Sequence, residues 1–158
     1  MPATKSRLDP IDKEKVRKEM REARVRREIQ ELEYRRKVKW GAGKLTQVDL
    51  ASSLGIAQPT LSGVLKTAEK IPEPREGFSG ATPLEICKRY SIHELSREQL
   101  IDELVRWDYT KPSMPNDWDS LVVDPPGAFS EVELAADIGL IDDSIYDEVF
   151  YRRHPKKK

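Results

Sequence analysis

Residues 47–66 read QVDLASSLGIAQPTLSGVLK and contain the clearest structural pattern in the chain. Gly55 favours the left-handed backbone that ends one helix, and Pro59 fits the first turn of a second helix, where its missing N–H costs nothing. Thr46 is suited to cap the first helix, and the small Ala51 lets two helices approach closely. Apolar residues recur at helical spacing on both sides of the glycine, at Leu50, Leu54, Ile56, Leu61, Val64 and Leu65. The pattern predicts two short helices joined by a tight turn.

A long basic helix is predicted before this pair, from Asp9 as N-cap and Pro10 as first helical residue to about Trp40. Strong helix formers dominate this segment, and neither proline nor glycine follows Pro10. Its apolar residues form short stripes that change face, so residues 1–28 are expected to be a loosely held arm and residues 29–40 to pack on the two short helices. The alternative is a solvated charged helix or coiled-coil arm, although strict heptads are absent.

The second half predicts further helices after a Pro- and Gly-rich linker at 71–82. We expect them at 83–90, 96–107, 130–138 and 142–152, with a loop over 108–128 that includes a short β-like run at 121–123. Ser96 and Asp142 are each predicted to cap a helix within a hydrophobic staple. The apolar residues expected to close one core are Leu84, Ile86, Tyr90, Leu100, Leu104, Trp107, Phe129, Leu134, Ile138, Tyr146 and Phe150.

The charges are unevenly distributed, although the chain has a net charge of zero. Residues 1–45 carry 15 basic against 8 acidic residues, a net charge of +7, and residues 46–75 carry 3 of each. Residues 76–158 carry 10 basic against 17 acidic residues, a net charge of −7. Such asymmetry suggests that the two halves meet different partners.

The pattern in residues 47–66 resembles the bacterial helix-turn-helix family of DNA-binding regulators. That family has an apolar residue, an alanine, an apolar-glycine-apolar triplet and two further apolar residues. The matching positions are Leu50, Ala51, Leu54, Gly55, Ile56, Leu61 and Val64. The resemblance covers 20 of 158 residues, so it identifies the module but not a subfamily. A purely structural helical corner is the alternative.

The resemblance implies that the second helix enters the major groove of double-stranded DNA and contacts base edges near its N-terminus. Gln58 is able to bond adenine in a bidentate manner, and the Thr60 methyl group is able to meet thymine. Gly63 stands where many relatives carry a basic side chain, a deficit that basic residues upstream would offset. The residues expected to contact DNA are Thr46, Gln47, Ala57, Gln58, Pro59, Thr60, Ser62, Gly63, Lys66, Arg35, Arg36, Lys39 and Lys44.

The sequence contains few residues suited to catalysis. Cys87 is the single cysteine, and the two histidines, His93 and His154, are far apart and outside any ligand-spaced cluster. No phosphate-binding glycine loop is present. The expectation is a non-enzyme without metal or cofactor. No leader-like or membrane-length apolar segment is evident, so a cytoplasmic, nucleoid-associated protein is expected.

These observations predict an all-α protein with a basic helical arm (1–28), a helix-turn-helix DNA-binding domain (29–70), a linker (71–82), an acidic helical interaction domain (83–152) and a basic tail (153–158). The expected function is transcriptional regulation, for example as a repressor. One alternative is an antitoxin that binds a basic toxin through its acidic half and autoregulates its operator. Another is an accessory protein of a phage or mobile element.

The aromatic residues Trp107, Tyr109, Trp118 and Phe129 suit a protein interface, although Trp107 and Phe129 suit a core better. A homodimer is compatible with the sequence, but no dimer seam is evident.

Overall fold

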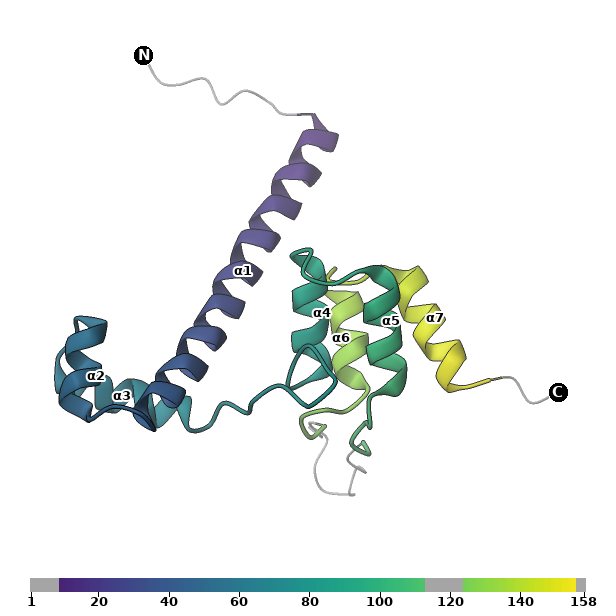
Figure 1. Ribbon diagram of the computed structural model, residues 1–158. Helices are drawn as coiled ribbons and strands as arrows, with labels where there is room; N and C mark the ends of the chain where they lie inside the picture. Colours follow the sequence, from purple (N-terminus) through teal and green to yellow (C-terminus); the bar gives the residue numbers. More distant parts are fainter. Residues whose placement is uncertain (1–8, 113–123, 156–158) are drawn as a thin grey trace, which may run out of the picture.

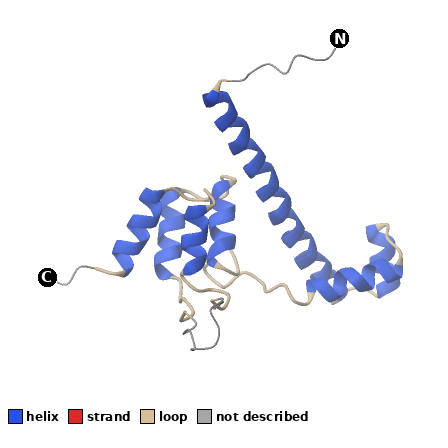
Figure 2. Ribbon diagram, turned by 180° about the vertical axis from the view of Figure 1, so that it is seen from behind, coloured by secondary structure: helices blue, strands red, loops and turns tan. Residues whose placement is uncertain are grey.

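The computed structural model describes residues 9–112 and 124–155, which are all-α apart from an isolated bridge between Thr110 and Ala128 (Figures 1 and 2). The helices are α1 (Pro10–Ala42), α2 (Gln47–Leu54), α3 (Gln58–Ala68), α4 (Pro83–Ser91), α5 (Arg97–Arg106), α6 (Ser130–Asp137) and α7 (Asp143–Arg153). The last four agree with the predicted bounds to within one residue at each end. The predicted β-like run at 121–123 and Trp118 lie outside the described residues.

Helix α1 is continuous through residues 28 and 29, where the sequence predicted a boundary between arm and domain. It begins at Pro10, with Asp9 in the N-cap position. Val25 and Ile29 are buried against α4–α7, whereas Val38 is buried against α2 and α3. Because successive residues rotate by about 100° around a helix, Val25 and Val38 point to different sides of α1. The two groups of helices accordingly lie on opposite sides of α1 (Figures 1 and 2).

The α2–α3 pair is formed by the interactions expected from residues 47–66. Thr46 Oγ1 accepts a hydrogen bond from the Asp49 N–H at 3.2 Å, which caps α2. Gly55 ends α2 with φ of 67°, a conformation that side chains with a Cβ rarely adopt. The small core between the helices consists of Val38, Leu50, Ala51 and Leu61, with Leu54, Ile56, Val64 and Leu65 at its edge.

Helices α4–α7 form a bundle of two helical hairpins in which α4 lies next to α1 and α7 lies farthest from it (Figures 1 and 2). The predicted caps are confirmed, since Ser96 accepts a hydrogen bond from the Gln99 N–H and Asp142 accepts one from the Ile145 N–H. The bundle core also includes Val25 and Ile29 of α1. Its buried residues from the bundle itself are Ile86, Cys87, Ile92, Leu100, Ile101, Leu104, Trp107, Val132, Ala135, Leu140, Ile141, Ile145 and Val149.

The core prediction was wrong for Leu134, Ile138 and Phe150, which are exposed. Both α6 and α7 carry two apolar stripes at helical spacing, and only one stripe of each helix faces the interior. Val132 and Ala135 fill the core from α6, and Ile145 and Val149 fill it from α7. The outer stripes therefore remain at the surface, while Trp107 is buried as predicted.

The predicted linker is held against the bundle by specific contacts. Phe78 packs edge-on against Trp107, with ring centroids 4.8 Å apart, and the Arg75 guanidinium lies 4.1 Å from the centre of the Trp107 ring. Ser79 Oγ donates a hydrogen bond to Glu103 at 2.9 Å.

Of the helices in the described ranges, none has both the length and the apolar character that crossing a membrane requires.

Candidate nucleic-acid interface

Helix α3 has one buried side and one open side. Leu61 and Ala68 are fully buried, two turns apart, and anchor the helix on α1 and α2. Ser62 and Lys66, one turn apart, are exposed on the other side. Gln58 and Thr60 are exposed in the first turn. The packing that holds α3 therefore leaves its polar side chains free to contact a partner.

The N-terminal end of α3 is open. Ala57 occupies the N-cap position, and no side chain of the described residues caps this end. The first N–H groups of a helix have no acceptor within the helix; because Pro59 has no N–H, those of Gln58 and Thr60 are the ones available here to an anion such as a phosphate. At Gly63, an added Cβ would meet no described atom within 4 Å. Pro59 is exposed in the first turn. A flat partner surface could approach this end of α3 closely.

The polar residues expected to contact phosphate lie near the same pair of helices. Gln47 begins α2 and is exposed, whereas the Thr46 hydroxyl is engaged in capping α2. Lys39 in the last turn of α1 and Lys44 in the turn before α2 are exposed. Arg35 is ion-paired with Glu31 at 2.7 Å. Lys39 and Lys44 therefore supply positive charge next to the start of α2, whereas the charge of Arg35 is partly neutralised by Glu31.

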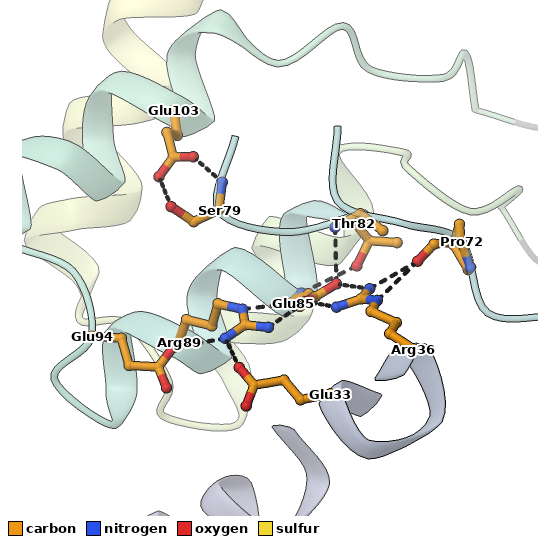
Figure 3. A network of polar contacts seen from close by, with 10 residues as sticks. Glu33, Arg36, Pro72, Ser79, Thr82, Glu85, Arg89, Glu94 and Glu103 are labelled. Carbon is orange, nitrogen blue, oxygen red and sulfur yellow. Dashed lines mark hydrogen bonds and ion pairs between the residues drawn. The ribbon is translucent and has the colours of Figure 1, made fainter. Parts of the chain in front are cut away.

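Arg36 lies apart from the other residues expected to contact DNA, because it is buried, with an exposed fraction of 9%. Its guanidinium donates two hydrogen bonds to the carboxylate of Glu85, at 2.7 and 2.9 Å, and two to the carbonyl oxygen of Pro72, at 2.9 and 3.1 Å (Figure 3). Sequence spacing could not distinguish Arg36 from its basic neighbours, since its partner lies 49 residues away. Arg36 joins α1 to α4 and to the segment after α3.

Glu85 is the centre of this buried polar network (Figure 3). Besides Arg36, Glu85 accepts hydrogen bonds from Arg89 at 3.0 and 3.2 Å and from the Ala81 N–H at 2.9 Å. Arg89 also donates to Glu33 of α1 at 2.9 Å and to Glu94 at 2.8 Å. The network therefore fixes α1, which positions α2 and α3, against α4.

The network determines the ionisation of Glu85. Burial by itself would raise the pKa of Glu85, but the hydrogen bonds from Arg36 and the Ala81 N–H, together with the charge of Arg36, hold the pKa of Glu85 below its ordinary value. Glu85 is consequently a carboxylate at neutral pH.

The sequence analysis missed Glu85 and Arg89, and the one available signal was a charged pair four residues apart beside the apolar Ile86 and Cys87.

The described residues contain no group of three or more His, Cys, Asp or Glu side chains placed to hold a metal ion. Cys87 is fully buried, and burial, followed by the charge of Glu131, raises the pKa of its thiol to about 12. A thiol in this state is a poor nucleophile.

Comparisons with protein-family models, with curated proteins and with solved structures found no match to this chain. The case for a function therefore rests on the residues and their geometry.

Proposed function

We propose that this protein is a sequence-specific regulator of transcription that binds double-stranded DNA by placing α3 in the major groove. The observation that carries the proposal is the two-sidedness of α3. Leu61 fixes one side in a core, while Gln58, Thr60 and Ser62 are exposed at or near an open helix end. A major groove about 12 Å wide admits a helix presented in this way.

In the proposed complex, Gln58 bonds an adenine edge through its amide, and the Thr60 methyl group packs on a thymine. Lys66, Lys39 and Lys44 neutralise phosphates, and phosphate neutralisation supplies most of the affinity that does not depend on sequence. Neither catalysis nor a cofactor is part of this function.

The bundle of α4–α7 is proposed to bind protein and not DNA. Residues 76–151 carry 5 basic against 17 acidic residues, a net charge of −12, which repels a polyanion. The antitoxin alternative would use the same charge to bind a basic toxin. The two alternatives differ in what copurifies from native cells, since an antitoxin brings a stoichiometric basic protein and a regulator does not.

Selection of bound sequences from random duplex DNA tests the proposal with the full-length protein. We expect one enriched motif, and binding to it that weakens steeply as salt rises. Gln58→Ala and Thr60→Ala should each weaken binding to that motif by about 1–3 kcal/mol, with little change on random DNA. Gln99→Ala, which truncates an exposed glutamine on α5, is the matched control and should leave binding unchanged.

Two results would reject the proposal. One is the absence of measurable duplex binding at low salt. The other is a motif whose recognition survives Gln58→Ala and Thr60→Ala combined, because α3 would then not be the element that contacts bases.

A further inference from the structure

The outer faces of α6 and α7 present apolar side chains that the fold does not bury. Leu134 on α6 and Ile138, the C-cap residue that directly follows this helix, are 44% and 40% exposed. Phe150 on α7 is 38% exposed and stacks on the half-buried Tyr146, with ring centroids 6.1 Å apart. We call these four residues the α6–α7 patch. Helices α6 and α7 pack on each other, and apolar side chains left exposed on neighbouring helices of a small protein commonly mark an interaction site.

Three exposed carboxylates border the α6–α7 patch, since Glu133 and Asp137 directly precede Leu134 and Ile138 and Asp147 directly follows Tyr146. Their charges, together with partial burial, also raise the pKa of Tyr146. An apolar surface with such a rim is complementary to an amphipathic segment that carries apolar and basic residues together.

The first half of α1 is a segment of that kind. Val16 and Met20, one turn apart, are 44% and 60% exposed. From here on, the arm means residues 12–24, the described part of the predicted basic arm that carries these two side chains. It contains four acidic residues and the six basic residues Lys13, Lys15, Arg17, Lys18, Arg21 and Arg24. The arm therefore has a net charge of +2 and an exposed apolar pair, which complement the acidic rim and the apolar side chains of the α6–α7 patch, although Arg17, Arg21 and Arg24 also pair with glutamates of α1.

The arm presents its apolar stripe away from its own bundle. Lys18, Arg21 and Val25 line a cleft between α1 and the bundle, so they mark the side of α1 that faces α4–α7. Val16 precedes Val25 by nine residues, which is two and a half helical turns, and hence lies on the opposite side. In addition, α1 lies beside α4, whereas α7 is on the far side of the bundle (Figures 1 and 2). One continuous helix cannot place its arm on the α6–α7 patch of the same chain.

We propose that the α6–α7 patch binds the arm of a second copy of this chain. Val16 and Met20 pack among the apolar side chains of the patch, where the Met20 sulfur suits the aromatic rings of Tyr146 and Phe150. Lys13, Arg17 and Arg24, each three or four residues from Val16 or Met20, lie on the apolar side of the arm and face the carboxylate rim. A two-fold dimer uses both arms and both patches, which makes the contact reciprocal. This inference deepens the proposed protein-binding role of the bundle and does not depend on DNA binding.

Sedimentation equilibrium of the full-length protein without DNA tests the proposal. We expect a dimer that dissociates more readily as salt rises. Val16→Glu with Met20→Glu (the arm variant) and Leu134→Lys with Ile138→Lys (the patch variant) should each raise the dimer dissociation constant at least about tenfold, since each places like charges together at the centre of the contact. Val48→Glu, at an exposed apolar residue of α2, is the control and should leave the dimer unchanged.

Mixing the two variants identifies which surfaces meet. An arm variant retains its patch and a patch variant retains its arm, so an equimolar mixture should associate more strongly than either variant alone. Glu133→Gln with Asp137→Asn changes only the rim and should weaken the dimer at low salt, which keeps the test valid if the patch variant does not fold.

Three results would overturn the proposal: a wild-type chain that is monomeric at low salt, an arm or patch variant that dimerises as the wild type does, or a mixture that associates no better than its components. Because the measurement contains no DNA, failure here leaves the proposed DNA binding untouched.

Discussion

Replacing Glu85 with alanine should destabilise the protein more than the loss of any exposed ion pair does. Glu85 is 5% exposed and Arg36 is 9% exposed, so the substitution leaves a buried guanidinium without a counter-charge. Removing one partner of a buried pair typically costs about 3–5 kcal/mol. Arg89 keeps Glu33 and Glu94, whereas among the residues that the structure describes Arg36 keeps only the Pro72 carbonyl oxygen. We therefore expect the lower end of that range, about 3 kcal/mol.

Urea unfolding followed by circular dichroism measures this loss as a change in unfolding free energy. The matched control is Asp102→Ala, which removes the exposed pair with Arg106 at 2.8 Å and should cost less than about 1 kcal/mol. Arg36→Met combined with Glu85→Leu removes both charges, so its cost should be smaller than the sum of the two single costs. A loss for Glu85→Ala no larger than that for Asp102→Ala would refute the conclusion that a buried charge network fixes α1 to α4.

Burial and ionisation lead to three further expected outcomes. Leu61→Ala should lower the free energy of unfolding by roughly 2–5 kcal/mol, measured with urea, because Leu61 is fully buried. Val48→Ala, at an exposed site, should change it by less than about 0.5 kcal/mol. Equal effects would contradict the described α2–α3 core. Cys87 should resist thiol reagents at neutral pH until denaturant is added, since burial raises the pKa of its thiol to about 12, and rapid labelling of the native chain would show otherwise. Glu85 and Asp142 have lowered pKa values in the folded chain, so they stabilise the fold above their ordinary pKa values and lose that effect as the pH falls. Urea titrations should therefore show a free energy of unfolding that declines in acid. The decline should be shallower in Glu85→Ala.

The sequence by itself determined the features that depend on neighbours a few residues apart. Thr46, Ser96 and Asp142 cap helices because each side chain reaches a backbone N–H three residues later. Gly55 ends α2 because its backbone adopts a conformation that other residues avoid. Such interactions are complete within a short segment, so the all-α class and the bounds of the last four helices could be predicted without the tertiary structure.

The tertiary structure alone decided which of several equivalent surfaces became buried. In α6 and its C-cap residue, the pair Val132 and Ala135 and the pair Leu134 and Ile138 both follow helical spacing, and only the closure of four helices selected the first pair for burial. Arg36 likewise resembles its basic neighbours in the sequence, and it was removed from the candidate DNA surface by Glu85, 49 residues away. Periodicity identifies candidate faces, but the burial of a face or a charge depends on residues distant in the chain, whose positions a local pattern does not contain.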